Sequence, residues 1–86
     1  MSLVKTSDAG RIARWREGWR VICDMADSVD VWLCPYSHQL IGWGVGRKKP
    51  PPFLDERCVF IGRYRRKFRF ADFLPDAVEA YQEAKN

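Results

Sequence analysis

The sequence contains few of the residues from which enzyme centres, metal sites and disulfide frameworks are built. Its 86 residues include one histidine and three cysteines. An odd number of widely spaced cysteines argues against a disulfide framework and for reduced thiols. No uncharged run approaches the roughly 20 apolar residues that a membrane helix needs, and the N-terminus lacks the basic-then-apolar layout of a signal peptide. The sequence therefore predicts an intracellular protein without a membrane span.

The spacing of the potential ligands is poor for a metal. Cys23, Cys34, His38 and Cys58 are of the types that zinc prefers, but among them Cys34 and His38 alone lie close in sequence. Three aspartates recur between residues 24 and 30, without the glycine and the terminal glutamate of a calcium loop. No acid–base set accompanies the histidine. We therefore expect no catalytic residues, no metal and no cofactor.

The composition fits one small folded domain. Hydrophobic residues make up 47% and aromatic residues 14% of the chain, which is too apolar for a disordered segment. The length leaves no room for a second core. We expect residues 1–86 to form a single domain, with residues 1–6 as a flexible tail.

The excess of positive charge lies in the second half of the chain. Residues 1–43 carry five Lys/Arg and five Asp/Glu, whereas residues 44–86 carry ten and six. Residues 47–69 alone hold nine basic and two acidic residues, a net charge of +7. A concentrated patch of this kind favours an acidic partner, and says nothing about the fold.

Hydrophobic periodicity predicts helix, strands and helix in that order. Ile12, Trp15 and Trp19 share one helical face, so we expect a helix over 8–17 with Trp15 as its core anchor. Residues 18–25 and 29–37 read as a hairpin, and residues 39–46 as a third strand. Prolines at 50–52 force a surface crossover. Strand material follows to residue 73, divided by a hairpin corner or a bulge at Gly62, and Pro75 suits the first position of a final helix.

These elements predict an α+β domain. We expect a small, strongly bent antiparallel sheet flanked by a short N-terminal helix and a C-terminal helix.

The segment RYRRKFRF, residues 63–70, places five basic and three aromatic residues in eight positions. In a strand, side chains alternate between faces, so four basic residues would line one side: Arg63, Arg65, Lys67 and Arg69. Such a row suits successive contacts with a phosphate backbone, although charged edge strands also serve simply to prevent aggregation. Tyr64 and Phe68, on the other side, suit the core better than base stacking.

Residues 18–53 resemble a malignant-brain-tumour (MBT) repeat. The resemblance rests on a G-x-R-V strand, a following aspartate, a D-x-W element, a serine turn before a G-W pair, and closing prolines. The matching residues are Gly18, Arg20, Val21, Asp24, Asp30, Trp32, Ser37, Leu40, Gly42, Trp43 and Pro50 to Pro52. The resemblance implies an SH3-like, Tudor-class barrel or partial barrel.

Family members that read methylated lysine hold the methylammonium in an aromatic cage. At the matching positions this chain has Cys23 and Ala26. Trp32, Tyr36 and Trp43 are the residues that would form a replacement cage, while core packing is the alternative for the two tryptophans.

The sequence favours a non-enzymatic binding module over an enzyme. The predicted partner is nucleic acid or an acidic protein surface. A further expectation is that the protein is associated with chromatin and therefore lies in the nucleus. A histone-tail reader and an interaction domain of a larger complex, docking through its sheet edge or C-terminal helix, are the alternatives. The oligomeric state is left open. The predicted contact residues are Arg47, Lys48, Lys49, Arg63, Arg65, Lys67 and Arg69.

Overall fold

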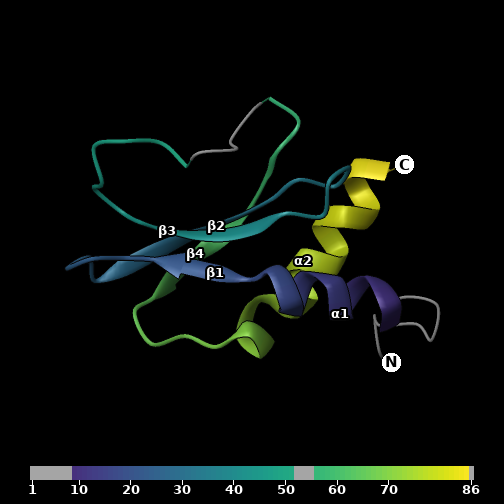
Figure 1. The fold of residues 1–86 in the computed structure, drawn as a ribbon, viewed down its shortest axis with the longest axis horizontal. Coiled ribbons are helices and arrows are strands. Elements are labelled where there is room, and N and C mark those ends of the chain that lie inside the picture. The colour runs from purple at the N-terminus through teal and green to yellow at the C-terminus, as the bar shows by residue number, and fades with distance from the viewer. Residues whose placement is uncertain (1–8, 52–55, 86) are drawn as a thin grey trace.

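The computed structural model describes residues 9–51 and 56–85, which form two helices and one four-stranded sheet (Figure 1). The predicted tail at residues 1–6 lies outside the described residues. The α+β class, with one helix before and one after the strands, is confirmed. The elements are α1 (Ala9–Gly18), β1 (Arg20–Ile22), β2 (Ser28–Leu33), β3 (Leu40–Gly44), β4 (Val59–Arg65) and α2 (Phe70–Lys85).

The sheet has the order β1-β3-β2-β4 and is mixed. β2 runs antiparallel to β3 and β4, whereas β1 pairs parallel with β3. The predicted hairpin of the first two strands is therefore wrong, because β3 lies between them. The sheet is also not wholly antiparallel, and it is not closed into the barrel that the MBT resemblance implies (Figure 1).

Glycines in β3 explain how β1 comes to lie beside it. A Cβ built on Gly44 would lie 2.7 Å from the Cys23 carbonyl oxygen, and one on Gly42 would lie 2.9 Å from the Trp19 ring. A side chain at either position would occupy the space that the segment around β1 now fills. The missing side chains thus admit β1 to this edge of the sheet.

Gly62 marks a bulge in β4, as one of the two alternatives predicted. Val31 pairs with Gly62, but the next residue of β2, Trp32, pairs with Phe60. Ile61 is the extra residue on the bulged strand.

Both helices pack on the same face of the sheet and enclose the core. Alternate residues of β2 point toward the helices, so the period-two pattern of the sequence is confirmed. Trp15 of α1 is fully buried, as predicted. The core cluster consists of Trp15, Val31, Leu33, Leu40, Phe70, Phe73, Ala77 and Val78.

Residues 45–51, the described part of the chain that follows β3, reach the opposite face of the sheet. Trp43 points away from the helices, and its indole Nε1 donates a hydrogen bond of 2.7 Å to the carbonyl of Lys49. Pro51 in the same segment is buried. The helices therefore cover one face of the sheet, and residues 45–51 contact Trp43 on the other.

β4 ends at Arg65, so the prediction that residues 63–70 form one strand is wrong. Arg66 and Lys67 form a turn, and Lys67 has a φ of 76°, a left-handed conformation incompatible with a continuing strand. Only Arg63 and Arg65 therefore share a strand face. Phe70 is buried at the start of α2. The alternation of basic and aromatic residues continues beyond the end of β4 because aromatic residues of both β4 and α2 pack into the core.

α2 begins at Phe70 and not at Pro75, because a capping interaction forms there. The Asp72 carboxylate accepts a hydrogen bond of 2.7 Å from the backbone N–H of Arg69, as the third helical residue does in a capping box. Pro75 lies inside the helix, where it lacks the N–H that would bond the Ala71 carbonyl. Phe70, Phe73 and Ala77 then extend the buried stripe.

Replacing Asp72 with alanine is expected to lower the free energy of unfolding by about 1 kcal/mol, because it removes the acceptor for the Arg69 N–H. Glu83→Ala is the matched control. Glu83 is exposed in the last turn of α2, where a negative charge opposes the helix dipole, so its removal should be neutral or slightly stabilising. Urea unfolding of both variants checks this, and equal losses would contradict it.

Candidate polyanion interface

Arg63 is engaged within the protein. It lies opposite Asp30 on the face of the sheet away from the helices, and its Nε donates to Asp30 Oδ1 at 2.8 Å. The hydrogen bond to Asp30 and then the charge of Asp30 raise the pKa of the Arg63 guanidinium. Arg63 is thus a paired cation, and less suited to a phosphate contact than the sequence predicts.

Arg47 is likewise held by its surroundings. Its guanidinium pairs with the carboxylate of Asp24, and its central carbon lies 4.5 Å from the centre of a Trp43 ring. Lys48 and Lys49, which follow it, are exposed. Because Trp43 pairs with Asp30, and Asp30 with Arg63, this face carries two aspartates among its cations and is not one continuous positive surface.

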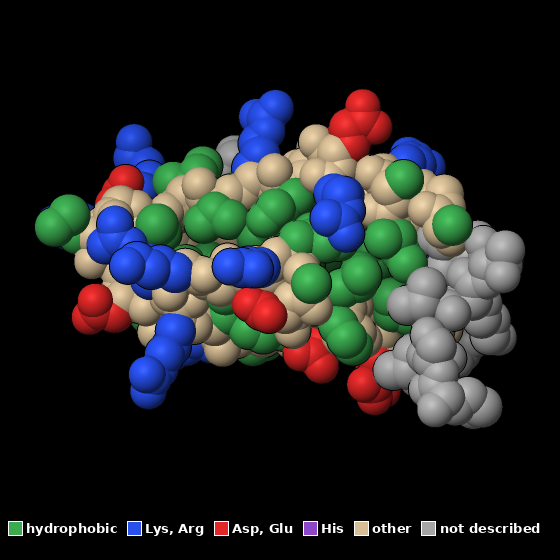
Figure 2. Space-filling view, turned by 90° about the horizontal axis from the view of Figure 1, so that it is seen from below, with side chains coloured by type: hydrophobic (Ala, Val, Ile, Leu, Met, Phe, Trp, Pro, Cys, Tyr) green, Lys and Arg blue, Asp and Glu red, His purple; other side chains and the backbone are tan. Residues whose placement is uncertain are grey.

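The turn after β4 gathers exposed cations that make no ion pair within residues 9–51 and 56–85. We call this group the basic turn: Arg65, Arg66, Lys67 and Arg69. Two backbone hydrogen bonds hold the turn, from Arg66 N–H to the Asp27 carbonyl and from Phe68 N–H to the Arg65 carbonyl. Figure 2 shows Lys and Arg side chains gathered toward one end of the face seen from below, beside a band of hydrophobic side chains. The basic turn is the densest group of unpaired cations in the described chain.

Aromatic packing beneath the basic turn keeps it in place. The Phe68 ring stacks on Tyr64 at 5.3 Å and meets Trp19 edge-on at 5.8 Å. The Tyr64 hydroxyl donates a hydrogen bond of 2.6 Å to Asp76, and burial, followed by this bond, raises the pKa of Tyr64. Tyr64 and Phe68 pack against the core, as predicted, so they are supports and not stacking platforms.

The three candidate cage residues have separate surroundings. Trp32 packs against Phe60 with ring centres 5.1 Å apart, while Trp43 lies under Arg47. Tyr36, in the turn after β2, is exposed and has the Lys85 ammonium 4.2 Å from its ring centre. Tyr36 therefore faces α2 and does not join the two tryptophans in one cage.

A cleft that the sequence did not predict lies beside α1, along β1 and β3. Its volume is about 450 Å³. Arg14, Arg20 and His38 contribute its ionisable groups. The sequence carries little signal for this cleft, since Arg14 and Arg20 are two of 15 basic residues.

Among the described residues, no group of three or more potential ligands could hold a metal ion. No disulfide joins the three cysteines, all of which lie in the described part of the chain. None of the helices in residues 9–51 and 56–85 is long and apolar enough to cross a membrane.

Comparison with known proteins identifies no relative. No protein-family model matches the chain, no curated protein is similar to it, and no solved structure matches its fold. The resemblance of residues 18–53 to an MBT repeat therefore stays a prediction.

Proposed function

We propose that this protein is a non-enzymatic binding module that holds nucleic acid through the basic turn. The observation that carries the proposal is the contrast between two sets of cations. Arg47 and Arg63 are paired with aspartates, whereas the basic turn presents four exposed cations that make no ion pair within residues 9–51 and 56–85.

Concentrated like charges repel one another, and this cost is relieved when an anionic backbone binds between them. The turn is fixed from below by Phe68, which leaves the long side chains above it free to adapt to phosphate spacing. Arg16 of α1 lies next to it, with its guanidinium carbon 4.6 Å from the Phe70 ring centre. We assign the main phosphate contacts to the basic turn, and secondary contacts to Arg16, Lys48 and Lys49.

Binding of labelled single-stranded DNA, duplex DNA and RNA, measured by fluorescence anisotropy over a range of salt concentrations, tests the proposal. Each phosphate contact contributes a slope of about −0.9 for duplex, or about −0.7 for single strands, to log K against log salt. The double variant Arg66→Gln/Lys67→Gln should bind more weakly, and its salt slope should be shallower by about 1.8 units for duplex and about 1.4 units for single strands.

Arg47→Gln/Arg63→Gln is the matched control, since it removes the same net charge from the ion-paired positions. We expect it to leave the salt slope nearly unchanged. Equal weakening by both double variants would reduce the effect to net charge and contradict the assigned surface. Absence of binding at low salt, or binding indifferent to salt, would overturn the nucleic-acid proposal and favour an acidic protein as the partner.

A further inference from the structure

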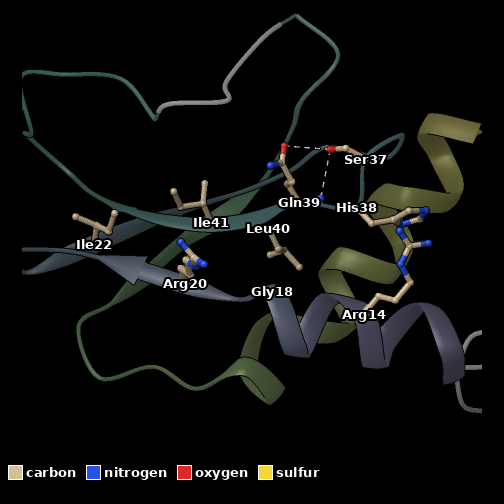
Figure 3. Close-up of a pocket in the computed structure, with 9 residues that line it drawn as sticks. All are labelled: Arg14, Gly18, Arg20, Ile22, Ser37, His38, Gln39, Leu40 and Ile41. Carbon is tan, nitrogen blue, oxygen red and sulfur yellow. Dashed lines mark hydrogen bonds between the residues drawn. The ribbon is translucent and has the colours of Figure 1, made fainter.

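The cleft along β1 and β3 has the features of a second, smaller anion site. The charged residues that line it are arginines, and no acidic residue of the described ranges lies in its lining. Figure 3 shows Arg14 of α1 beside His38 at one end of the cleft, while Arg20 lies farther along β1 beneath β3. Neither arginine makes an ion pair within the described residues. The cleft thus has two cationic side chains in its lining, Arg14 at one end and Arg20 nearer its middle.

His38 is fixed in the orientation and proton state of a hydrogen-bond donor. The residue has a φ of 61°, and its backbone N–H donates a hydrogen bond of 2.8 Å to the Cys34 carbonyl. The Trp15 indole donates a 3.1 Å hydrogen bond to His38 Nδ1. Because Nδ1 accepts, the neutral ring carries its proton on Nε2 and can donate from there.

The protein around His38 favours the neutral ring. Burial is the largest cause of its lowered pKa, followed by the positive charges of Arg14, Arg11 and Lys85. Arg11 and Arg14 come from α1 and Lys85 from α2, and the Tyr81 ring of α2 lies 5.6 Å from the imidazole. Among the described residues, no carboxylate contributes to the pKa of His38 against these charges. A bound anion would do so.

The rest of the lining combines polar donors with an apolar wall. The Ser37 hydroxyl donates to Gln39 Oε1 at 3.2 Å, which leaves the amide nitrogen of Gln39 as a donor. The apolar residues of the lining are Leu40 between the two arginines, Ile41 beside Arg20, and Ile22 beyond Arg20 (Figure 3). A ligand that matches this lining has an anionic group and an apolar body.

We propose that the cleft binds a small organic anion, whose oxyanion group lies against Arg14 and His38 and whose apolar body lies along Leu40 and Ile41 toward Arg20. The oxyanion is a phosphate or a carboxylate, which share the acceptor geometry that guanidinium and imidazole donors recognise. This site is independent of the basic turn and goes beyond the proposed function.

The chain has one histidine, so its imidazole signals in a long-range ¹H–¹⁵N spectrum belong to His38 without ambiguity. Titrations of pH with and without phenyl phosphate, benzoate and inorganic phosphate test the site. A bound anion should raise the pKa of His38, in a saturable way, since it counters the three surrounding cations. Phenyl phosphate and benzoate are compared to identify the class of oxyanion. The preferred class is that of the probe which raises the pKa of His38 at the lower concentration. Inorganic phosphate, which lacks the apolar body, should bind more weakly than phenyl phosphate.

Arg14→Gln is the test variant and Arg16→Gln its matched control in the same helix, since Arg16 faces Phe70 and not the cleft. Arg14→Gln should weaken the affinity for the anion, measured from the concentration that half-saturates the pKa shift of His38, about tenfold or more. Arg16→Gln and Arg66→Gln/Lys67→Gln should leave this affinity unchanged. Amide spectra check that each variant is folded. The proposal is overturned if no probe shifts the pKa of His38 at saturating concentration, or if the Arg14 and Arg16 variants respond alike. Loss of nucleic-acid binding with an intact His38 response would refute the basic turn alone.

Discussion

Replacing Trp15 with alanine is expected to lower the free energy of unfolding by about 3–5 kcal/mol, as truncation of large buried aromatic residues does. The Trp15 side chain is fully buried in the cluster between both helices and the sheet. Its ring also meets Tyr81 edge-on at 5.7 Å, and its indole N–H holds His38. A small domain has only about 5–15 kcal/mol of total stability, so the variant should be partly unfolded at moderate temperature.

Trp32→Ala is the matched control, because Trp32 is a half-buried tryptophan on the other face of the sheet. The Trp32→Ala variant should lose clearly less free energy of unfolding than Trp15→Ala, as measured by urea or thermal unfolding. Trp15→Phe separates the two roles of the residue, since it keeps most of the buried ring and removes the hydrogen bond to His38 Nδ1. We expect it to cost about 1–3 kcal/mol. Equal losses for Trp15→Ala and Trp32→Ala would contradict the position of the core.

Replacing Gly44 with alanine is expected to destabilise the protein by about 1–3 kcal/mol, because overpacking against a backbone forces shifts. The new Cβ would lie 2.7 Å from the Cys23 carbonyl oxygen and 3.0 Å from its Cα. Neither atom can move without displacing the segment that follows β1. The variant should therefore loosen β1 from β3, which chemical unfolding and the amide spectrum of residues 20–22 would register.

Gly10→Ala serves as the control for Gly44→Ala. Gly10 lies in α1, and a Cβ built on it meets nothing within 4 Å. The substitution removes chain entropy from the unfolded state and should be neutral or stabilising by up to about 1 kcal/mol. A Gly44 variant as stable as the parent would show that β1 and β3 can separate at little cost.

The sequence was most informative where burial follows a regular period. Trp15 anchors a helix and Val29, Val31 and Leu33 line one strand face because each is buried at the expected spacing. β1 carries no such signal, since all three of its residues are exposed. Its pairing depends on glycines of β3 that are remote in sequence, whereas the local pattern predicts pairing with the nearest strand.

The candidate sites show the same limit. The density of basic residues within 47–69 is visible in the sequence, but the pairing of Arg47 and Arg63 is not, because Asp24 and Asp30 lie far from them in sequence. The positive φ of Lys67 also has no clear signature in a segment that alternates charge and aromatic character. The cleft at His38 joins α1, β1 and the turn before β3, a juxtaposition that exists only in the folded chain.

The parallel placement of β1 next to β3 has a consequence for the order of folding. β2 and β3 are joined by a short turn and can zip together locally, with little loss of loop entropy. Within the described chain, β1 pairs with β3 and with no earlier strand. During synthesis residues 20–22 can therefore enter the sheet only after residues some twenty positions downstream have been made.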